Sequence, residues 1–241
     1  IKVKKMEKNN KKYIIIIGII LIYILIKCFL AYSLYDTKRL WSDDIYDINL
    51  LSDSLVVKHE ELDDSEYIQV NDIKIKNYFE NFKYDEKRNI YIKYDDNGKV
   101  LSHFIVDNFS SIPQFEEDSD EYKYLKKHNI NDSIDYTKFV ANYEFVKNTI
   151  FTPIWKIKDN YLECEIVQMS GRTPGEYQII EGDLKGVLIS TDMGENRNLY
   201  VLYLNNESKS YSLNFTNGNK DNAFFNDKVI KDILNTLKYV E

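Results

Sequence analysis

Residues 13–32 form a long apolar segment, and this feature limits the fold of the chain more than any other. No charged side chain occurs from Tyr13 to Ile26, and Lys27 is the only charge in the rest of the segment. Twenty residues of α-helix rise about 30 Å, which is enough to cross the hydrocarbon core of a bilayer. A buried helix of a soluble domain usually keeps a polar face, and this segment has none. We therefore predict a transmembrane helix over residues 13–32.

The residues on either side of this segment predict its orientation. Residues 1–12 contain six lysines and a single glutamate. By the positive-inside rule, such a lysine-rich tail stays in the cytoplasm. Tyr13 at one end, and Tyr32 and Trp41 at the other, suit the aromatic belts of the two membrane interfaces. We expect a single-pass signal-anchor in the cell membrane, with the lipid bilayer as its partner and the C-terminal part outside.

Two other interpretations of the segment stay open. Cleavage near Ser33 would follow a small-x-small pattern, although the apolar stretch is longer than the usual 7–15 residues of a signal peptide. Lipid attachment at Cys28 would need a small residue immediately before the cysteine, where Lys27 stands. Residues 1–5 precede the first methionine, Met6, and are either native or an added extension.

Composition narrows the possible partners of the remaining chain. Residues 33–241 carry 25 basic and 38 acidic side chains, a net charge of −13. Such an acidic region repels phosphate backbones, so we expect no nucleic-acid partner. Its apolar and aromatic content is too high for a disordered chain, so this region should fold. The richness in Ile, Lys, Asn and Tyr is typical of an AT-rich bacterial genome.

Hydrophobic periodicity predicts an α+β fold, with an antiparallel β-sheet backed by helices after the transmembrane helix. We interpret residues 33–66 as an acidic connector with one strand near 54–59, and residues 67–241 as the extracytoplasmic domain. Within residues 89–107, apolar and polar residues alternate on both sides of Asn97-Gly98, which predicts a hairpin with a type I′ turn. Residues 70–79 are expected to add a strand to the same sheet. Helices are predicted within 116–129 and 131–148, with Asp132 or Ser133 capping the second. A helix is also favoured within 153–169, with a strand as the alternative.

In the C-terminal part of the chain, the hydrophobic pattern changes to a period of two residues, as in β-strands. Four short strands are predicted at 176–183, 185–191, 198–206 and 209–217, joined by tight turns into an antiparallel meander. Residues 227–241 then form an amphipathic helix whose apolar stripe consists of Val229, Ile230, Ile233, Leu234 and Leu237. Such a stripe must be covered, and one face of the meander is the expected cover.

Residues 200–241 resemble the end of PsbP-like extracytoplasmic domains, in which an aromatic-rich strand precedes a terminal helix that covers an antiparallel sheet. The resemblance is confined to this C-terminal part. It implies the α+β fold and a non-enzymatic role, and it identifies no site residue.

No motif in the sequence points to catalysis, and we assign no catalytic, cofactor-binding or metal-ligating residue and no cofactor. His59, His103 and His128 are scattered and lack the spacing of metal ligands. Cys28 and Cys164 are too few for a metal cluster, and Cys164 is expected to be a buried thiol, with a reactive thiol as the alternative. The loop around Arg172 is interpreted as a turn, with an anion contact as the alternative.

Two acidic stretches also have simpler explanations than metal binding. A calcium loop around Gly98 would place Lys93 and Phe104 where carboxylates are required, so we interpret this stretch as a turn. The acidic run 116–121 is explained as a solvated helix N-terminus.

We therefore expect a membrane-anchored extracytoplasmic binding or interaction protein whose partner is another envelope protein. The alternative is a small-ligand-binding module with a pocket between sheet and helices, and a hydrolase is the third choice.

Overall fold

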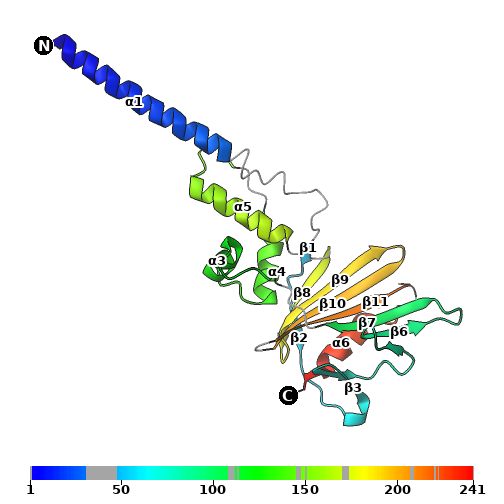
Figure 1. Cartoon of the computed structure of the whole chain (residues 1–241). Helices are drawn as coiled ribbons and strands as arrows, with labels where there is room; N and C mark the ends of the chain where they lie inside the picture. The colour runs from blue at the N-terminus through cyan, green and yellow to red at the C-terminus, as the bar shows by residue number, and fades with distance from the viewer. Residues whose placement is uncertain are drawn as a thin grey trace. The chain divides into compact units, whose positions relative to one another are not determined.

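The computed structural model describes residues 2–30, 48–107, 112, 114–144, 148–149, 151–169, 174–206, 209–219, 221 and 223–240. Side chains are described from Lys11 onward, except those of residues 206 and 209. The chain divides into two compact units. The first joins Ile1–Ile45 to Tyr143–Met169, and the second joins Tyr46–Asn142 to Ser170–Glu241. Figure 1 shows the helices and strands of each unit.

The first unit contains the long N-terminal helix α1 (Lys2–Phe29). Its stretch Lys11–Phe29 is long and apolar enough to cross a membrane, and the side chains from Tyr13 to Ile26 are exposed, apart from the half-buried position of Gly18. Lys27 is buried instead, and its ammonium lies 5.7 Å from the centre of the Tyr23 ring. The predicted apolar helix is confirmed, and it continues through the lysine-rich tail.

The second helix of this unit is α5 (Ile154–Gln168). It begins directly after Pro153, whose fixed φ angle favours the first turn of a helix. Its buried side chains include Ile157, Leu162 and Cys164. The buried Asn160 donates a hydrogen bond to Asn148 over 2.9 Å. The helix predicted within residues 153–169 is confirmed.

The second unit is built on a sheet of nine strands. Their order is β1-β8-β9-β10-β11-β7-β6-β5, with β2 also paired to β8. The four C-terminal strands form the predicted antiparallel meander, with bounds β8 (Gly175–Gly182), β9 (Gly186–Gly194), β10 (Arg197–Asn206) and β11 (Lys209–Asn217). Glu195 and Asn196 join β9 to β10 with φ angles of 50° and 60°, as a two-residue type I′ loop requires.

The predicted hairpin at residues 89–107 is confirmed as β6 (Ile90–Tyr94) and β7 (Val100–Asp107), with the short strand β5 (Lys83–Asp85) beside β6. Its turn is not type I′, because Gly98 has a positive φ angle and Asn97 does not. The Asp95 carboxylate accepts hydrogen bonds from the backbone N–H groups of Asn97 and Lys99, over 2.9 and 2.7 Å. These bonds stabilise a wider loop, which needs only one residue with positive φ.

The segment predicted as an acidic connector contributes to the sheet. Strands β1 (Ile48–Leu50) and β2 (Leu55–Val57) both run parallel to β8, and the short 3₁₀ helix η2 (Asp64–Glu66) follows them. β2 is the strand expected near residues 54–59. The sheet therefore begins earlier than the predicted domain start at residue 67. The prediction missed this because three-residue strands among acidic residues produce almost no periodic signal. Residues 33–47 of the connector lie outside the described residues.

A second, three-stranded sheet consists of β3 (Tyr67–Val70), β4 (Ile73–Lys76) and β12 (Lys238–Tyr239). The prediction that residues 70–79 join the main sheet is wrong, because β4 pairs with β3 and β12. Asn71, with a φ angle of 55°, makes the tight turn that folds β4 back onto β3. The C-terminal residues then close the other edge of β4.

Helices cover both faces of the main sheet. The terminal helix α6 (Asp227–Thr236) and the small sheet lie on one face, where they enclose the larger core (Figure 1). Ile230, Ile233 and Leu234 of α6 are buried in this core, as predicted. On the opposite face, Ile134 of α4 (Ser133–Ala141) packs against a smaller core on β8, β9 and β10. The α+β class and the antiparallel meander are therefore confirmed.

The two short helices α3 (Asp120–Lys127) and α4 both begin at a side-chain cap, and only the cap of α4 was predicted. Ser119 accepts a hydrogen bond from the backbone N–H of Tyr122 at the start of α3. Asp132 accepts from the backbone N–H groups of Ile134 and Asp135 at the start of α4. Of the two caps proposed for the second helix, Asp132 is the one used.

We expect Leu234→Ala to destabilise the full-length protein in detergent by about 2–5 kcal/mol, because it removes fully buried methyl groups from the core under α6. Lys228→Ala, at an exposed position of the same helix, should change the free energy of unfolding by less than about 0.5 kcal/mol. Urea unfolding followed by the near-ultraviolet circular dichroism of the tyrosines measures both. Equal midpoints for the two variants would show that α6 does not pack on the sheet.

Candidate functional site

One row of polar side chains crosses the core-facing side of the main sheet. Glu176 of β8 pairs with Ser190 of β9, and Ser190 pairs with Tyr200 of β10. Since alternate residues of a strand face the same side, these three share a face with the core residues Ile180 and Leu202. The same face therefore changes from apolar to polar toward the start of β8.

A cleft opens where this polar row meets the first turns of α6. Its cavity volume is about 440 Å³, within the usual range for small-molecule sites. We call it the sheet–helix cleft, and its lining consists of Leu51, Leu55, Glu176, Gln178, Leu188, Ser190, Tyr200, Asp227, Ile230 and Lys231. Four of these residues are apolar and six are polar or charged, so the cleft can hold a ligand that has both kinds of surface.

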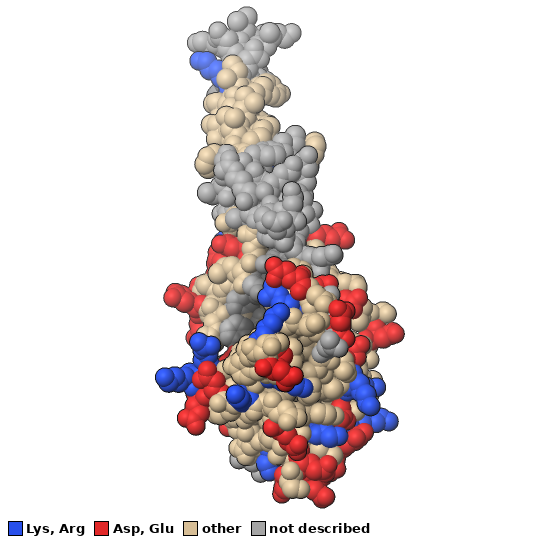
Figure 2. Space-filling view, turned by 90° about the vertical axis from the view of Figure 1, so that its right-hand side faces the viewer, with Lys and Arg blue, Asp and Glu red and all other residues tan. Residues whose placement is uncertain are grey.

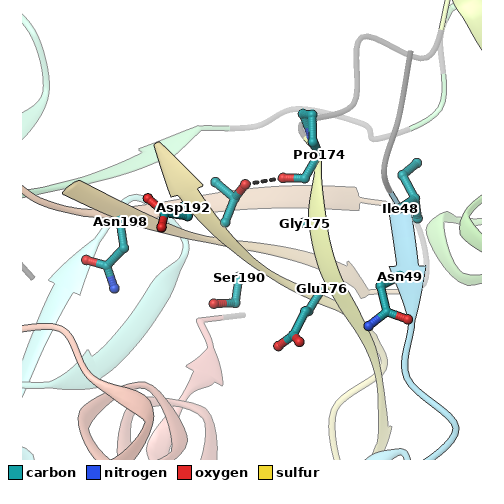
Figure 3. Close-up of a pocket in the computed structure, with 9 residues that line it drawn as sticks. Ile48, Asn49, Pro174, Gly175, Glu176, Ser190, Asp192 and Asn198 are labelled. Carbon is teal, nitrogen blue, oxygen red and sulfur yellow. Dashed lines mark hydrogen bonds between the residues drawn. The ribbon is translucent and has the colours of Figure 1, made fainter. Parts of the chain in front are cut away.

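A second hollow adjoins the cleft at the edge of the sheet (Figure 3). This edge hollow has a volume of about 700 Å³ and is lined by Ile48, Asn49, Pro174, Gly175, Glu176, Ser190, Thr191, Asp192 and Asn198. Glu176 and Ser190 line both spaces, and Figure 3 shows their side chains directed to the same side of the sheet. The two spaces therefore meet at this pair.

Close backbone packing fixes the start of β8, which lines the edge hollow. A Cβ atom on Gly175 would lie 2.4 Å from the carbonyl oxygen of Ser190, so only glycine fits there without a shift of β8. The Thr191 hydroxyl donates a hydrogen bond to the carbonyl of Pro174, which is drawn as a dashed line in Figure 3. These contacts hold the start of β8 against β9 and thereby set the position of Glu176.

Tyr200 connects the sheet to α6 on the inner side of the cleft. Its hydroxyl donates a hydrogen bond to the Asp227 carboxylate over 2.7 Å. Burial and this hydrogen bond raise the pKa of Tyr200, so it remains a neutral donor at physiological pH. Asp227 lies in the first turn of α6, where the helix dipole favours a negative charge, and Asn226 caps the same turn through the N–H of Val229.

The polar side chains of the cleft are better suited to binding a ligand than to nucleophilic attack on it. Glu176 is exposed, and within the described part of the chain no hydrogen bond or ion pair engages its side chain. Gln178 donates to the carbonyl of Asp53 over 3.1 Å, which leaves its amide oxygen able to accept. Lys231 adds one positive charge to the lining that contains the carboxylates of Glu176 and Asp227. These groups suit hydrogen bonds and ion pairs with a ligand that carries an ammonium group.

The histidines considered in the sequence lie apart from this site. His59 pairs with Glu61 over 3.0 Å, and His128 follows α3 and stacks on Tyr124 with ring centroids 4.2 Å apart. His103 lies on β7, where burial lowers its pKa. Over the described ranges, no group of three or more His, Cys, Asp and Glu residues is arranged to hold a metal ion.

The cysteines and the arginine loop also lie elsewhere. Cys28 is half-buried near the end of α1, and Cys164 is buried on α5, as expected for an unreactive thiol. Burial raises the pKa of Cys164, which disfavours the reactive thiolate. Arg172 lies outside the described residues. The acidic run 116–121 surrounds the Ser119 cap of α3, as a helix N-terminus would predict.

Sequence reasoning assigned no role to Glu176, Ser190, Tyr200 or Asp227. The sequence nevertheless held one indication of the site. Glu176 and Ser190 lie on the same face of their strands as core residues, where a polar side chain is unusual. Detecting it requires the register of β8 against β9, which the sequence does not provide.

Comparison with protein-family models finds no match for this chain, and comparison with curated proteins finds none either.

We expect Tyr200→Phe to lower the free energy of unfolding by about 0.5–1.5 kcal/mol, because it removes the hydrogen bond to Asp227 while the ring stays in place. Tyr94→Phe, at an exposed position on β6, serves as the control and should have almost no effect. Urea unfolding of both variants checks this. If Tyr200→Phe is as stable as the unaltered protein, this hydrogen bond does not hold α6 to the sheet.

Proposed function

We propose that this protein is a single-pass membrane protein whose N-terminus is cytoplasmic and whose sheet domain lies outside the cell. Support comes from α1, which is long and apolar enough to cross a membrane, and from the lysines that precede its apolar stretch. The acidic character of residues 33–241 also suits a domain that remains free of the anionic membrane surface. On the face seen in Figure 2, acidic and basic side chains are intermingled.

The role we propose for the sheet domain is non-enzymatic binding of a small ligand in the sheet–helix cleft. The observation that carries this proposal is the meeting of two carboxylates, Glu176 and Asp227, with an apolar wall that includes Leu188 and Ile230. A ligand with an ammonium group beside an apolar segment would satisfy both surfaces. No described His or Cys lines the cleft or the edge hollow, which favours binding over nucleophilic catalysis.

A second candidate function is binding of another envelope protein. Tyr84, Tyr94 and Val100 are exposed apolar side chains on neighbouring strands at the β5 edge of the main sheet. Exposed aromatic groups at a sheet edge favour a protein partner. The resemblance to PsbP-like domains agrees with either role and stays a prediction.

The topology predicts a specific proteolysis pattern. Protease added to intact protoplasts should digest the sheet domain and leave the lysine-rich tail protected by the membrane. Immunoblotting with one antibody against residues 1–12 and another against residues 227–241 detects both ends. If the C-terminal epitope survives on intact cells and disappears only after lysis, the proposed orientation is wrong.

Ligand binding predicts that primary alkylamines raise the melting temperature of the full-length protein in detergent, in a concentration-dependent way. Glu176→Gln should weaken this binding roughly tenfold, equivalent to about 1.5 kcal/mol, because it removes a charge-assisted hydrogen bond. Glu181→Gln is a matched control, since Glu181 is exposed on the same strand but faces the other side of the sheet. Equal affinities for the two variants, or no shift with any amine, would contradict the proposed cleft function.

A further inference from the structure

Two large aromatic side chains are exposed at the start of α5. Phe151 is 85% exposed, more than any other large hydrophobic side chain that the structure describes. Trp155 lies four residues later, in the first turn of α5, and is 67% exposed. We call Phe151 and Trp155 the aromatic pair. Exposing this much aromatic surface to water is unfavourable, so the pair needs a cover or a partner.

The backbone around the pair is held by local hydrogen bonds. The N–H of Phe151 donates to the Thr149 hydroxyl over 3.2 Å, and the N–H of Thr152 donates to the Thr149 carbonyl over 3.0 Å. The N–H of Thr149 donates in turn to the Thr152 hydroxyl over 2.9 Å. Other positions of α5, among them Ile157 and Val167, are buried. The exposed aromatic pair therefore belongs to a structured turn on a helix that is packed elsewhere.

The aromatic pair belongs to the same compact unit as α1. On α1, the side chains from Tyr13 to Ile26 are exposed apart from Gly18, whereas Lys27 near the C-terminal end is buried. Other parts of the chain therefore cover α1 near the C-terminal end of its apolar stretch. If α1 spans a bilayer, this end lies at the outer membrane interface.

We propose that the aromatic pair inserts into the outer membrane interface, so that the start of α5 is a second contact with the lipid bilayer. This inference rests on the proposed role of α1 as a membrane anchor. Trp is enriched at membrane interfaces because its ring is apolar while its N–H can still reach water and headgroups. Lys156 and Lys158 follow Trp155 within three positions and suit the headgroup region, where their stems can lie along apolar surface.

The attachment is apolar rather than electrostatic. Residues 33–241 carry a net charge of −13, so anionic lipid would repel the domain as a whole. The aromatic pair needs no anionic lipid, because burial of its rings provides the attraction. The contact should therefore form on zwitterionic phosphatidylcholine membranes.

The chain has only two tryptophans, so Trp41→Phe leaves Trp155 as the single tryptophan reporter in the full-length protein. This variant is reconstituted into phosphatidylcholine vesicles whose acyl chains are brominated either near the headgroup or near the chain end. We expect strong quenching of Trp155 emission by the shallow bromines and much weaker quenching by the deep ones. The double variant Trp41→Phe/Trp155→Phe provides the fluorescence background, and Trp41→Phe/Phe151→Ser should reduce the shallow quenching.

Flotation of the same vesicles separates the two proposals. If the protein floats with the vesicles but Trp155 emission is the same with and without bromine, the anchor stands and the interfacial contact is refuted. If the protein does not float, the proposed anchor fails, and the interfacial contact fails with it. Equal quenching by shallow and deep bromines would also refute an interfacial position.

Discussion

A column of stacked phenylalanine rings joins parts of the second unit that are far apart in the sequence. Phe104 of β7 stacks on Phe79, which follows β4, and on Phe215 of β11, with ring centroids 4.8 Å apart in both pairs. Phe215 also contacts Phe225, two residues before α6, edge to face with ring centroids 5.1 Å apart. All four rings are buried, and each aromatic pair adds about 0.5–1.5 kcal/mol beyond the burial of its area. The position of α6 on the sheet depends on this column.

Because α6 is placed in this way, it covers only part of the sheet face. Its apolar residues lie over strands whose inward side chains are apolar, whereas its first turn lies beside the polar row of Glu176, Ser190 and Tyr200. A polar side chain in a sealed core would need a hydrogen-bond partner, and an exposed one can use water or a ligand. The bond from Tyr200 to Asp227 marks the limit of the covered region. The sheet–helix cleft therefore forms where the apolar core ends.

The first unit combines two properties that suit a membrane location. Its helix α1 exposes an apolar stretch that is unfavourable in water, and its helix α5 exposes the aromatic pair while burying its other side. Lipid can cover both surfaces, whereas an acidic domain cannot rely on charge for attachment. We propose that membrane attachment belongs to the first unit and ligand binding to the second.

The sequence by itself determined the local elements. The apolar segment, the Asp132 cap, the Asn-Gly hairpin and the four strands of the meander are all readable, because their signals lie within a few neighbouring residues. The tertiary structure alone decided three features: the pairing of β1 and β2 with β8, the separate sheet built on β4, and the cleft. Each joins residues more than a hundred positions apart, such as Leu51 with Glu176, or Ile73 with Tyr239. Such contacts depend on strand register and on which residues α6 leaves uncovered, and both are set by packing of the whole core rather than by local propensity.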